Sequence, residues 1–269
     1  MITVAKSAAQ AAGKILIENY GKLSPHAIRQ KAANDFISFV DEQSEDKIIS
    51  IIKETYPAHS FLAEESGLQQ HSDTYQWIID PLDGTTNYIH QIPVFAVSIG
   101  LKLKDELILG VIYNPVSNEM FWAEKGKGAF LNDSPIQVTN KDDISQCLIA
   151  TGFPFKAKQH LPAYLEAFAE IFLSCRGMRR MGAAAIDLAY VAAGRFDGFW
   201  EFGLSPWDVA AGAVIIREAG GMVSDFWNKP FFLHNNYIVA SNGNIHKDLL
   251  YKIQKAFPFY IDVYEEPKI

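Results

Sequence analysis

The spacing of apolar residues changes twice along the chain, and this order restricts the fold more than any other feature. Near the N-terminus apolar residues recur every three or four positions, which predicts amphipathic helices over residues 2–20 and 42–56. Shorter β-rich runs then predict a meander of strands at residues 59–63, 76–80, 94–103, 107–113 and 119–123. Helical spacing returns from about residue 160.

The second half of the chain alternates between the two patterns. Helices are predicted over 160–174, 183–194, 206–218 and 244–256, with strands at 198–201, 222–226 and 237–240. Helices, then a sheet, then alternating elements favour a layered α/β (α+β) protein. A polar segment at 140–143 predicts a boundary between an N-terminal α+β half, residues 1–143, and a C-terminal α/β half, residues 144–269.

Composition excludes several classes of protein. The 269 residues are 49% apolar and 20% charged, which favours a folded globular chain over a disordered one. Lys and Arg number 24 against 31 Asp and Glu, for a net charge of −7. This sign argues against strong non-specific binding to nucleic acid.

The cysteines and the N-terminus bear on the cellular compartment. Cys147 and Cys175 stand in no metal-ligand spacing, so neither a disulfide framework nor a structural zinc site is expected. No apolar run reaches the 18 residues of a membrane span, and the first residues do not have the pattern of a secretory signal. We therefore expect a cytoplasmic protein that does not enter a membrane.

The most informative segment is residues 77–87. An apolar strand runs into Asp80, Pro81 favours an extended turn, and Asp83 follows three positions later. Two carboxylates this close repel each other, so a shared proton or hard divalent cations must offset the charge. Gly84 allows close approach of the backbone to a ligand, and Thr85 stands where a helix can begin, a favourable position for phosphate. Taken alone, the segment could be a simple turn and helix cap, which is what most isolated Asp-Gly pairs form.

Three further acidic segments strengthen the metal and phosphate interpretation. Glu64 and Glu65 follow a β-like run, and Asp208 begins an apolar helix that ends before Gly220. Asp41 lies at the start of the second predicted helix. Each of these acids also has a structural interpretation, as a solvated charge or a helix cap.

Together these segments resemble the inositol monophosphatase family. The resemblance rests on residues 63–66, 77–87 and 207–212 with 218–221, and it spans nearly the whole chain. Residues 149–158 and 187–195 are most similar to the bacterial inositol-1-monophosphatase branch. The resemblance implies a layered αβαβα fold of the sugar-phosphatase type and a metal site where the two halves meet.

The resemblance also implies roles for individual residues. Two to three Mg²⁺ ions would be held by the side chains of Glu64, Asp80, Asp83 and Asp208 and by the backbone carbonyl of Leu82. Glu64 and Thr85 would be catalytic and position the attacking water. Asp41 would orient Thr85.

Substrate contacts are implied in the same way. The backbone at Gly84 and Thr85 would hold the phosphate. The hydroxyl groups of a polyol would meet a second set of residues: Asp83, Asp208, the turn Gly182, Ala183 and Ala184, and Glu201, which lies seven positions before Asp208.

The expected function is hydrolysis of inositol-1-phosphate to inositol and phosphate by direct attack of a metal-activated water. Alternative substrates are 3'-phosphoadenosine 5'-phosphate, fructose-1,6-bisphosphate and histidinol phosphate, because specificity depends on loops that one sequence describes poorly. The resemblance further implies lithium sensitivity and a homodimer. A non-catalytic role in a transcription complex is the alternative, for which the small basic cluster Arg176, Arg179 and Arg180 could face a partner.

A phosphatase of the haloacid dehalogenase type is a competing interpretation. That class also has an Asp-x-Asp-Gly-Thr segment after a strand, and its first aspartate forms an aspartyl-phosphate. Here three positions rather than two separate Asp80 from Asp83. The spacing therefore argues against this mechanism.

Overall fold

The structure is a computed structural model that describes residues 1–23, 28–32, 35–155, 157–230 and 232–257, with side chains described outside 24–38. Its helices are α1 (Ile2–Asn19), α2 (Phe39–Thr55), α3 (Thr85–Ile89), α4 (Leu161–Phe172), α5 (Ala184–Ala192), α6 (Pro206–Glu218) and α7 (His246–Ala256). In the described residues no helix has the length and apolar character needed to cross a membrane.

The larger of the two main sheets has eight strands in the order β10-β9-β8-β7-β6-β5-β3-β4. These are β3 (Ser60–Ala63), β4 (Gly67–Gln69), β5 (Tyr75–Asp83), β6 (Ala96–Leu103), β7 (Glu106–Asn114), β8 (Glu119–Glu124), β9 (Ala129–Leu131) and β10 (Ser134–Ile136). Consecutive strands from β5 to β10 pair antiparallel, whereas β3 pairs parallel with β5. The predicted meander is therefore present in this sheet.

The smaller main sheet has five strands in the order β12-β11-β13-β15-β14. They are β11 (Leu148–Thr151), β12 (Gly177–Arg179), β13 (Gly198–Phe202), β14 (Met222–Ser224) and β15 (Tyr237–Ser241). A separate hairpin pairs β1 (Ile28–Ala32) with β2 (Asp35–Ser38).

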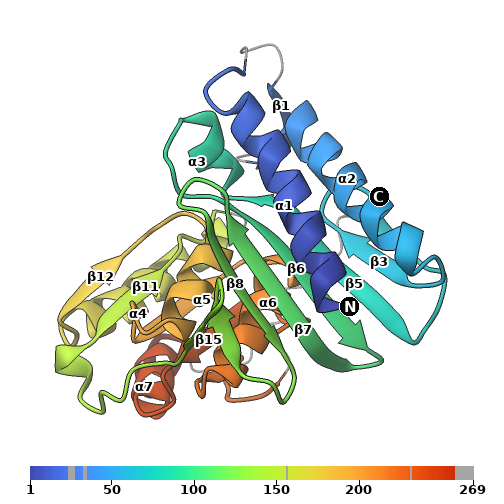
Figure 1. The fold of residues 1–269 in the computed structure, drawn as a ribbon. Coiled ribbons are helices and arrows are strands. Elements are labelled where there is room, and N and C mark those ends of the chain that lie inside the picture. Colours follow the sequence, from blue (N-terminus) through green and yellow to red (C-terminus); the bar gives the residue numbers. More distant parts are fainter. Residues whose placement is uncertain (24–27, 33–34, 156, 231, 258–269) are drawn as a thin grey trace.

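Helices and sheets alternate in five layers, which confirms the predicted αβαβα arrangement (Figure 1). Helices α1 and α2 cover one face of the large sheet, and α5 and α6 lie between the two sheets. Helices α4 and α7 cover the outer face of the small sheet. Each interface is a cluster of buried apolar side chains, and such burial is the main source of stability. The predicted division at residue 143 remains a prediction.

Helix α6 lies unusually close to the large sheet. A Cβ added to Gly100 would be 2.9 Å from the Ala210 side chain, and one added to Gly110 would overlap the backbone of Ala211. On the other side of α6, a Cβ at Gly212 would meet Leu188 of α5. Glycines on both surfaces therefore allow the close packing that fixes the position of α6 and of Asp208 in its first turn.

Most predicted elements agree with the structure within three residues at each end. The strand predicted over 222–226 ends at Ser224, because the Asp225 carboxylate accepts hydrogen bonds from the backbone N–H groups of Trp227 and Lys229 and closes a turn. The strands β4, β9, β10, β11 and β12, all of three or four residues, are not among the predicted elements.

Candidate metal centre and substrate pocket

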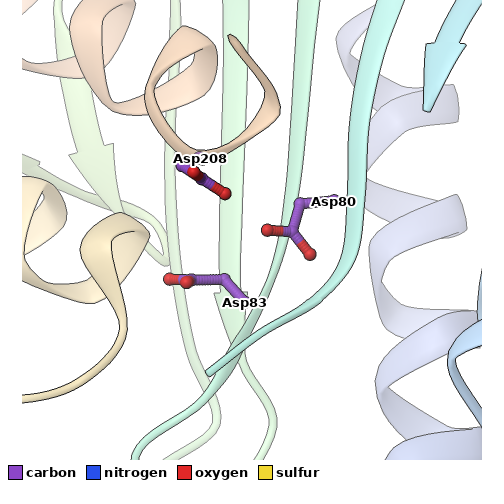
Figure 2. A group of neighbouring side chains, drawn as sticks. All are labelled: Asp80, Asp83 and Asp208. Carbon is purple, nitrogen blue, oxygen red and sulfur yellow. The ribbon is translucent and has the colours of Figure 1, made fainter. Parts of the chain in front are cut away.

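Three aspartates meet at the junction of β5 and α6. Asp80 and Asp83 lie at the end of β5, and Asp208 lies in the first turn of α6. Each offers an oxygen, and these oxygens lie within 4.8 Å of one another. Figure 2 shows the three carboxylates pointing into one common space. Residues 125 or more positions apart in the chain thus form one cluster.

The end of β5 is irregular, and this irregularity brings two acids to one side. Asp80 pairs with Ser98 and Asp83 with Ala96, so one extra residue is accommodated on β5. Pro81 has no N–H for the sheet. The Asp80 carboxylate accepts a hydrogen bond from the N–H of Leu82 at 2.9 Å, which holds the turn.

Asp208 is fixed by the start of its helix. Its Oδ2 accepts a hydrogen bond from the N–H of Ser205 at 2.7 Å, in a capping arrangement with Pro206 in the first turn. The Ser98 hydroxyl of β6 donates to the carbonyl of Trp207 at 3.2 Å. The helix start is therefore tied to the strand beside Asp80.

Burial and mutual repulsion make this cluster electrostatically unfavourable without a cation. Burial and the charges of Glu64, Asp83 and Asp208 raise the pKa of Asp80 well above its usual value. Burial and then Asp208 raise the pKa of Asp83 to about 7, although the N–H of Ala185 donates to its Oδ2 at 2.7 Å. Hard cations that prefer oxygen ligands would relieve this repulsion. The donor set therefore fits Mg²⁺.

The other predicted metal ligands lie beside the three aspartates. Glu64 directly follows β3, its N–H donates to the carbonyl of Ile79 at 3.2 Å, and its charge acts on Asp80. The carbonyl of Leu82 accepts a hydrogen bond from the Thr85 hydroxyl at 3.0 Å. The structure thus brings all five predicted ligands to one end of β5.

Thr85 and Asp41 are also neighbours. The Thr85 hydroxyl lies 3.4 Å from Oδ1 of Asp41, which is fully buried in the first turn of α2. Asp41 belongs to α2, which covers the face of the large sheet opposite to the one that α6 covers. The predicted pair is therefore in contact range across 44 positions of sequence.

The loop between β5 and α3 depends on a glycine. Gly84 has φ 92° and precedes α3, and an added Cβ would be 3.0 Å from the carbonyl oxygen of Val94 and 3.2 Å from Ala183. Only glycine adopts this conformation without strain. The first N–H groups of a helix have no acceptor within the helix, so Gly84 and Thr85 can offer them to a phosphate.

A small pocket opens beside the aspartates. It is lined by the predicted substrate residues Asp83, Gly182, Ala183, Ala184, Glu201 and Asp208, together with Gly152, Arg180 and Leu204. Gly182 has φ +87°. The Asn87 amide donates to the carbonyls of Val94 and Met181 at 2.8 and 2.9 Å, so it joins the β5–α3 loop to the Gly182 turn.

Two residues in or near this pocket, Arg180 and Asp187, were not predicted to take part in the site. Arg180 lines it and also stacks over Phe153 and Phe155, so this arginine is not only part of a basic surface cluster. Asp187 of α5 is buried, its Oδ1 has no hydrogen-bond partner among the described residues, and burial together with Glu201 and Asp83 raises its pKa well above the usual value. An aspartate inside the apolar run of residues 184–192 was the available signal.

Comparison with known proteins identifies the family of this chain. The family model described as "Inositol monophosphatase family" matches residues 1–258. The chain belongs to the inositol monophosphatase family. This family assignment, which covers nearly the whole chain, also argues against the haloacid dehalogenase alternative.

Individual family members match over nearly their whole length. The protein named Nus factor SuhB of Escherichia coli K12 is 45% identical over 251 residues, 93% of this chain and 94% of that protein. An inositol-1-monophosphatase of Mesorhizobium japonicum is 41% identical, covering 95% and 96%. The crystal structure of extragenic suppressor protein suhB from Bartonella henselae superimposes with a TM-score of 0.89 at 41% identity, covering 94% and 98%.

Proposed function

We propose that this member of the family is a cytoplasmic, magnesium-dependent phosphomonoesterase that hydrolyses inositol-1-phosphate to inositol and phosphate. The observation that carries the proposal is the cluster of Asp80, Asp83 and Asp208, whose carboxylate oxygens lie within 4.8 Å of one another beside the pocket. In a chain of this family, such a cluster is best explained as a metal site.

Glu64, Asp80, Asp83, Asp208 and the carbonyl of Leu82 would hold two to three Mg²⁺ ions. When bound, the ions lower the pKa of water and withdraw charge from the phosphate ester. Without a bound cation, the negative charge of these aspartates would disfavour the binding of an anionic substrate in the pocket.

The chain's own hydrogen bonds support the proposed role of Thr85. Its hydroxyl has one proton and two nearby acceptors, the Leu82 carbonyl at 3.0 Å and Asp41 at 3.4 Å. Whichever acceptor takes the proton, the oxygen lone pairs are left to accept a hydrogen bond from water. Thr85 would thus orient the attacking water together with Glu64, and Asp41 would hold Thr85 in this orientation.

The pocket supports a small polyol as the alcohol part of the substrate. Asp83 and Glu201 would accept hydrogen bonds from hydroxyl groups, while the turn Gly182–Ala184 leaves room for the ring. The phosphate would meet the N–H groups of Gly84 and Thr85 at the start of α3.

Phosphate release tests this proposal. Inositol-1-phosphate, fructose-1,6-bisphosphate, 3'-phosphoadenosine 5'-phosphate and histidinol phosphate are each incubated with Mg²⁺, with chelator, and with Mg²⁺ plus Li⁺. We expect Mg²⁺-dependent, Li⁺-inhibited turnover that favours inositol-1-phosphate. The turnover of Asp83→Asn should be lower than that of the wild type on the order of 10²-fold or more, as for loss of a preorganised electrostatic group. The exposed Asp105→Asn is the matched control.

Other outcomes discriminate among the alternatives. A clear preference for another ester would keep the metal site and replace the substrate. Failure of the folded protein to hydrolyse any of the four esters with Mg²⁺ would contradict the proposal.

A second role, in a transcription complex, is favoured by the names of several relatives, including the Nus factor SuhB of Escherichia coli at 45% identity. Arg176 and Arg179 are exposed at the small-sheet edge and could meet such a partner. Co-purification of tagged protein with RNA polymerase tests this role. Retention of polymerase by Asp83→Asn, and its loss in Arg176→Ala/Arg179→Ala, would support two separable functions.

We also propose a homodimer. Helix α4 exposes Leu161, Leu165 and Phe172, at 44%, 52% and 55%, along one side of the helix. Apolar side chains gathered in this way commonly mark an interface. Sedimentation should give a dimer that Leu165→Glu dissociates, whereas Leu68→Glu, at a leucine 57% exposed on β4, should not.

A further inference from the structure

Gly152 lies next to the carboxylate of Glu201, at the end of two paired strands. Strands β11 and β13 run parallel, with Ala150 opposite Phe199 and Thr151 opposite Trp200. Continuing this register by one residue brings Gly152 beside Glu201, and both residues line the substrate pocket. The two residues are therefore neighbours by strand pairing as well as by their position in the pocket.

The space above Gly152 is filled by the Glu201 carboxyl group. If a Cβ were added to Gly152, its three nearest atoms would be Cδ, Oε1 and Oε2 of Glu201, all well inside van der Waals contact. No side chain at position 152 can coexist with Glu201 in this conformation.

Backbone conformation does not explain this glycine. Gly152 is not among the glycines with positive φ, so an alanine could adopt its backbone conformation without strain. The three atoms nearest to an added Cβ all belong to Glu201, so the requirement for glycine comes from that side chain.

We propose that Gly152 is a positioning residue that sets where the Glu201 carboxylate meets the hydroxyl groups of the substrate. In this way it contributes to the preference for polyol phosphates. This inference rests on the proposed function, because it assigns the origin of specificity within the same pocket.

The surroundings of Glu201 make its position consequential. Arg180 lines the same pocket, and the charge of Glu201 acts on both Asp187 and Tyr164. If the Glu201 carboxylate were displaced from its place beside Gly152, its distances to Arg180, to Asp187 and to the bound polyol would all change.

Gly152→Ala is suited to a test because the obstructing group is the end of a flexible side chain. The variant should fold, and the carboxylate should move instead of the backbone. Gly177→Ala is the matched control, since the nearest atom to its added methyl is Leu148 Cδ1 at 3.5 Å, an ordinary contact in the same sheet.

The experiment is a double-mutant cycle on inositol-1-phosphate hydrolysis. We expect Gly152→Ala to raise KM by about tenfold or more, as for a lost hydrogen bond to a charged group, with kcat changed less than about threefold. In a Glu201→Ala background the methyl group has room, so the same substitution should change KM less than about twofold. p-Nitrophenyl phosphate, which has no polyol hydroxyls, should show a smaller effect of Gly152→Ala.

Each result decides the inference. Wild-type KM in Gly152→Ala, or an equal loss with and without Glu201, would overturn it, as would a crystal structure of Gly152→Ala with the carboxylate unmoved. If the wild-type protein prefers another ester, the proposed substrate is wrong, and the same cycle with that ester decides the role of Gly152 separately. If the wild type hydrolyses no ester, the proposed function fails and this inference fails with it.

Discussion

At the scale of single residues, Asp83 is held in a position that stabilises its protonated form. Its pKa is raised to about 7, first by burial and then by Asp208. The folded protein therefore binds this proton more tightly than the unfolded chain does. The stability that Asp83 contributes is fully present below about pH 4, and it is lost as the pH rises through about 7.

Asp83→Asn should therefore stabilise the metal-free protein, although it lowers activity on the order of 10²-fold or more. We expect roughly 1–3 kcal/mol at pH 8, because the amide oxygen can still accept from the N–H of Ala185. Urea unfolding in chelator at pH 8 measures this change. Added Mg²⁺ should raise the melting temperature of the wild type and not that of Asp83→Asn, and a destabilised variant would contradict the prediction.

His246 responds to pH in the opposite direction. It is fully buried between the hydroxyls of Ser224 and Ser241, each 2.9 Å from a ring nitrogen, and burial lowers its pKa to about 4. The unfolded chain binds this proton more tightly, so the stability that His246 contributes is fully present above about pH 6.5 and is lost as the pH drops toward 4.

This histidine should contribute up to about 3 kcal/mol to the loss of stability between pH 6.5 and 4. His246→Asn should flatten that part of the unfolding free energy plotted against pH, even if the variant is less stable at every pH. His71→Asn, on an exposed histidine, serves as the control. An unchanged slope in His246→Asn would show that other groups cause the acid sensitivity.

At the scale of elements, the contact between α6 and β7 determines where Asp208 lies. The methyl group of Gly110→Ala would overlap the backbone of Ala211, which cannot move alone because α6 also packs on α5. Overpacking of this kind typically costs about 1–3 kcal/mol. We expect that loss in urea unfolding, together with a higher Mg²⁺ concentration for half-maximal activity. Gly177→Ala should change neither quantity.

How well an element could be predicted depended on whether its signal is local. Helix α6 has its limits in the sequence, with Ser205 and Pro206 at one end and Gly220 soon after the other, and it was predicted to the residue. Strand β11 has four residues whose partners, β12 and β13, lie far along the chain. Its identity as a strand depends on that pairing, which no local pattern records.

At the scale of the whole molecule, the layer formed by α5 and α6 packs against both main sheets. One cluster of buried side chains includes Ile112 and Phe121 of the large sheet and Phe199 and Ile238 of the small one. Residues 1–143 alone would leave one face of the large sheet uncovered.

We therefore expect a fragment of residues 1–143 to aggregate or remain unfolded, because exposed apolar sheet faces associate. Circular dichroism and size-exclusion chromatography measure this directly. Co-expression with residues 144–269 should restore a soluble complex. A fragment that is monomeric and cooperatively folded by itself would instead support two independent domains.

The candidate site was predictable to the extent that its residues share a motif. Asp80, Asp83 and Thr85 stand within six positions, Asp208 was a candidate at the start of a predicted helix, and the family resemblance supplied Glu201. The contacts of Gly152 with Glu201 and of Asn87 with Met181 depend on how separate layers meet. Sequence patterns describe what a segment does alone, so such contacts between segments were not accessible.

Asp208 lies 125 positions after Asp83 in the sequence, and this separation has a consequence for biosynthesis. Asp80 and Asp83 leave the ribosome well before Asp208 and the rest of α6. At ordinary elongation rates the interval is on the order of ten seconds. Until α6 is made, the cation site lacks Asp208 and the large sheet lacks the layer that covers one of its faces, so the metal site can be completed only after synthesis has passed α6.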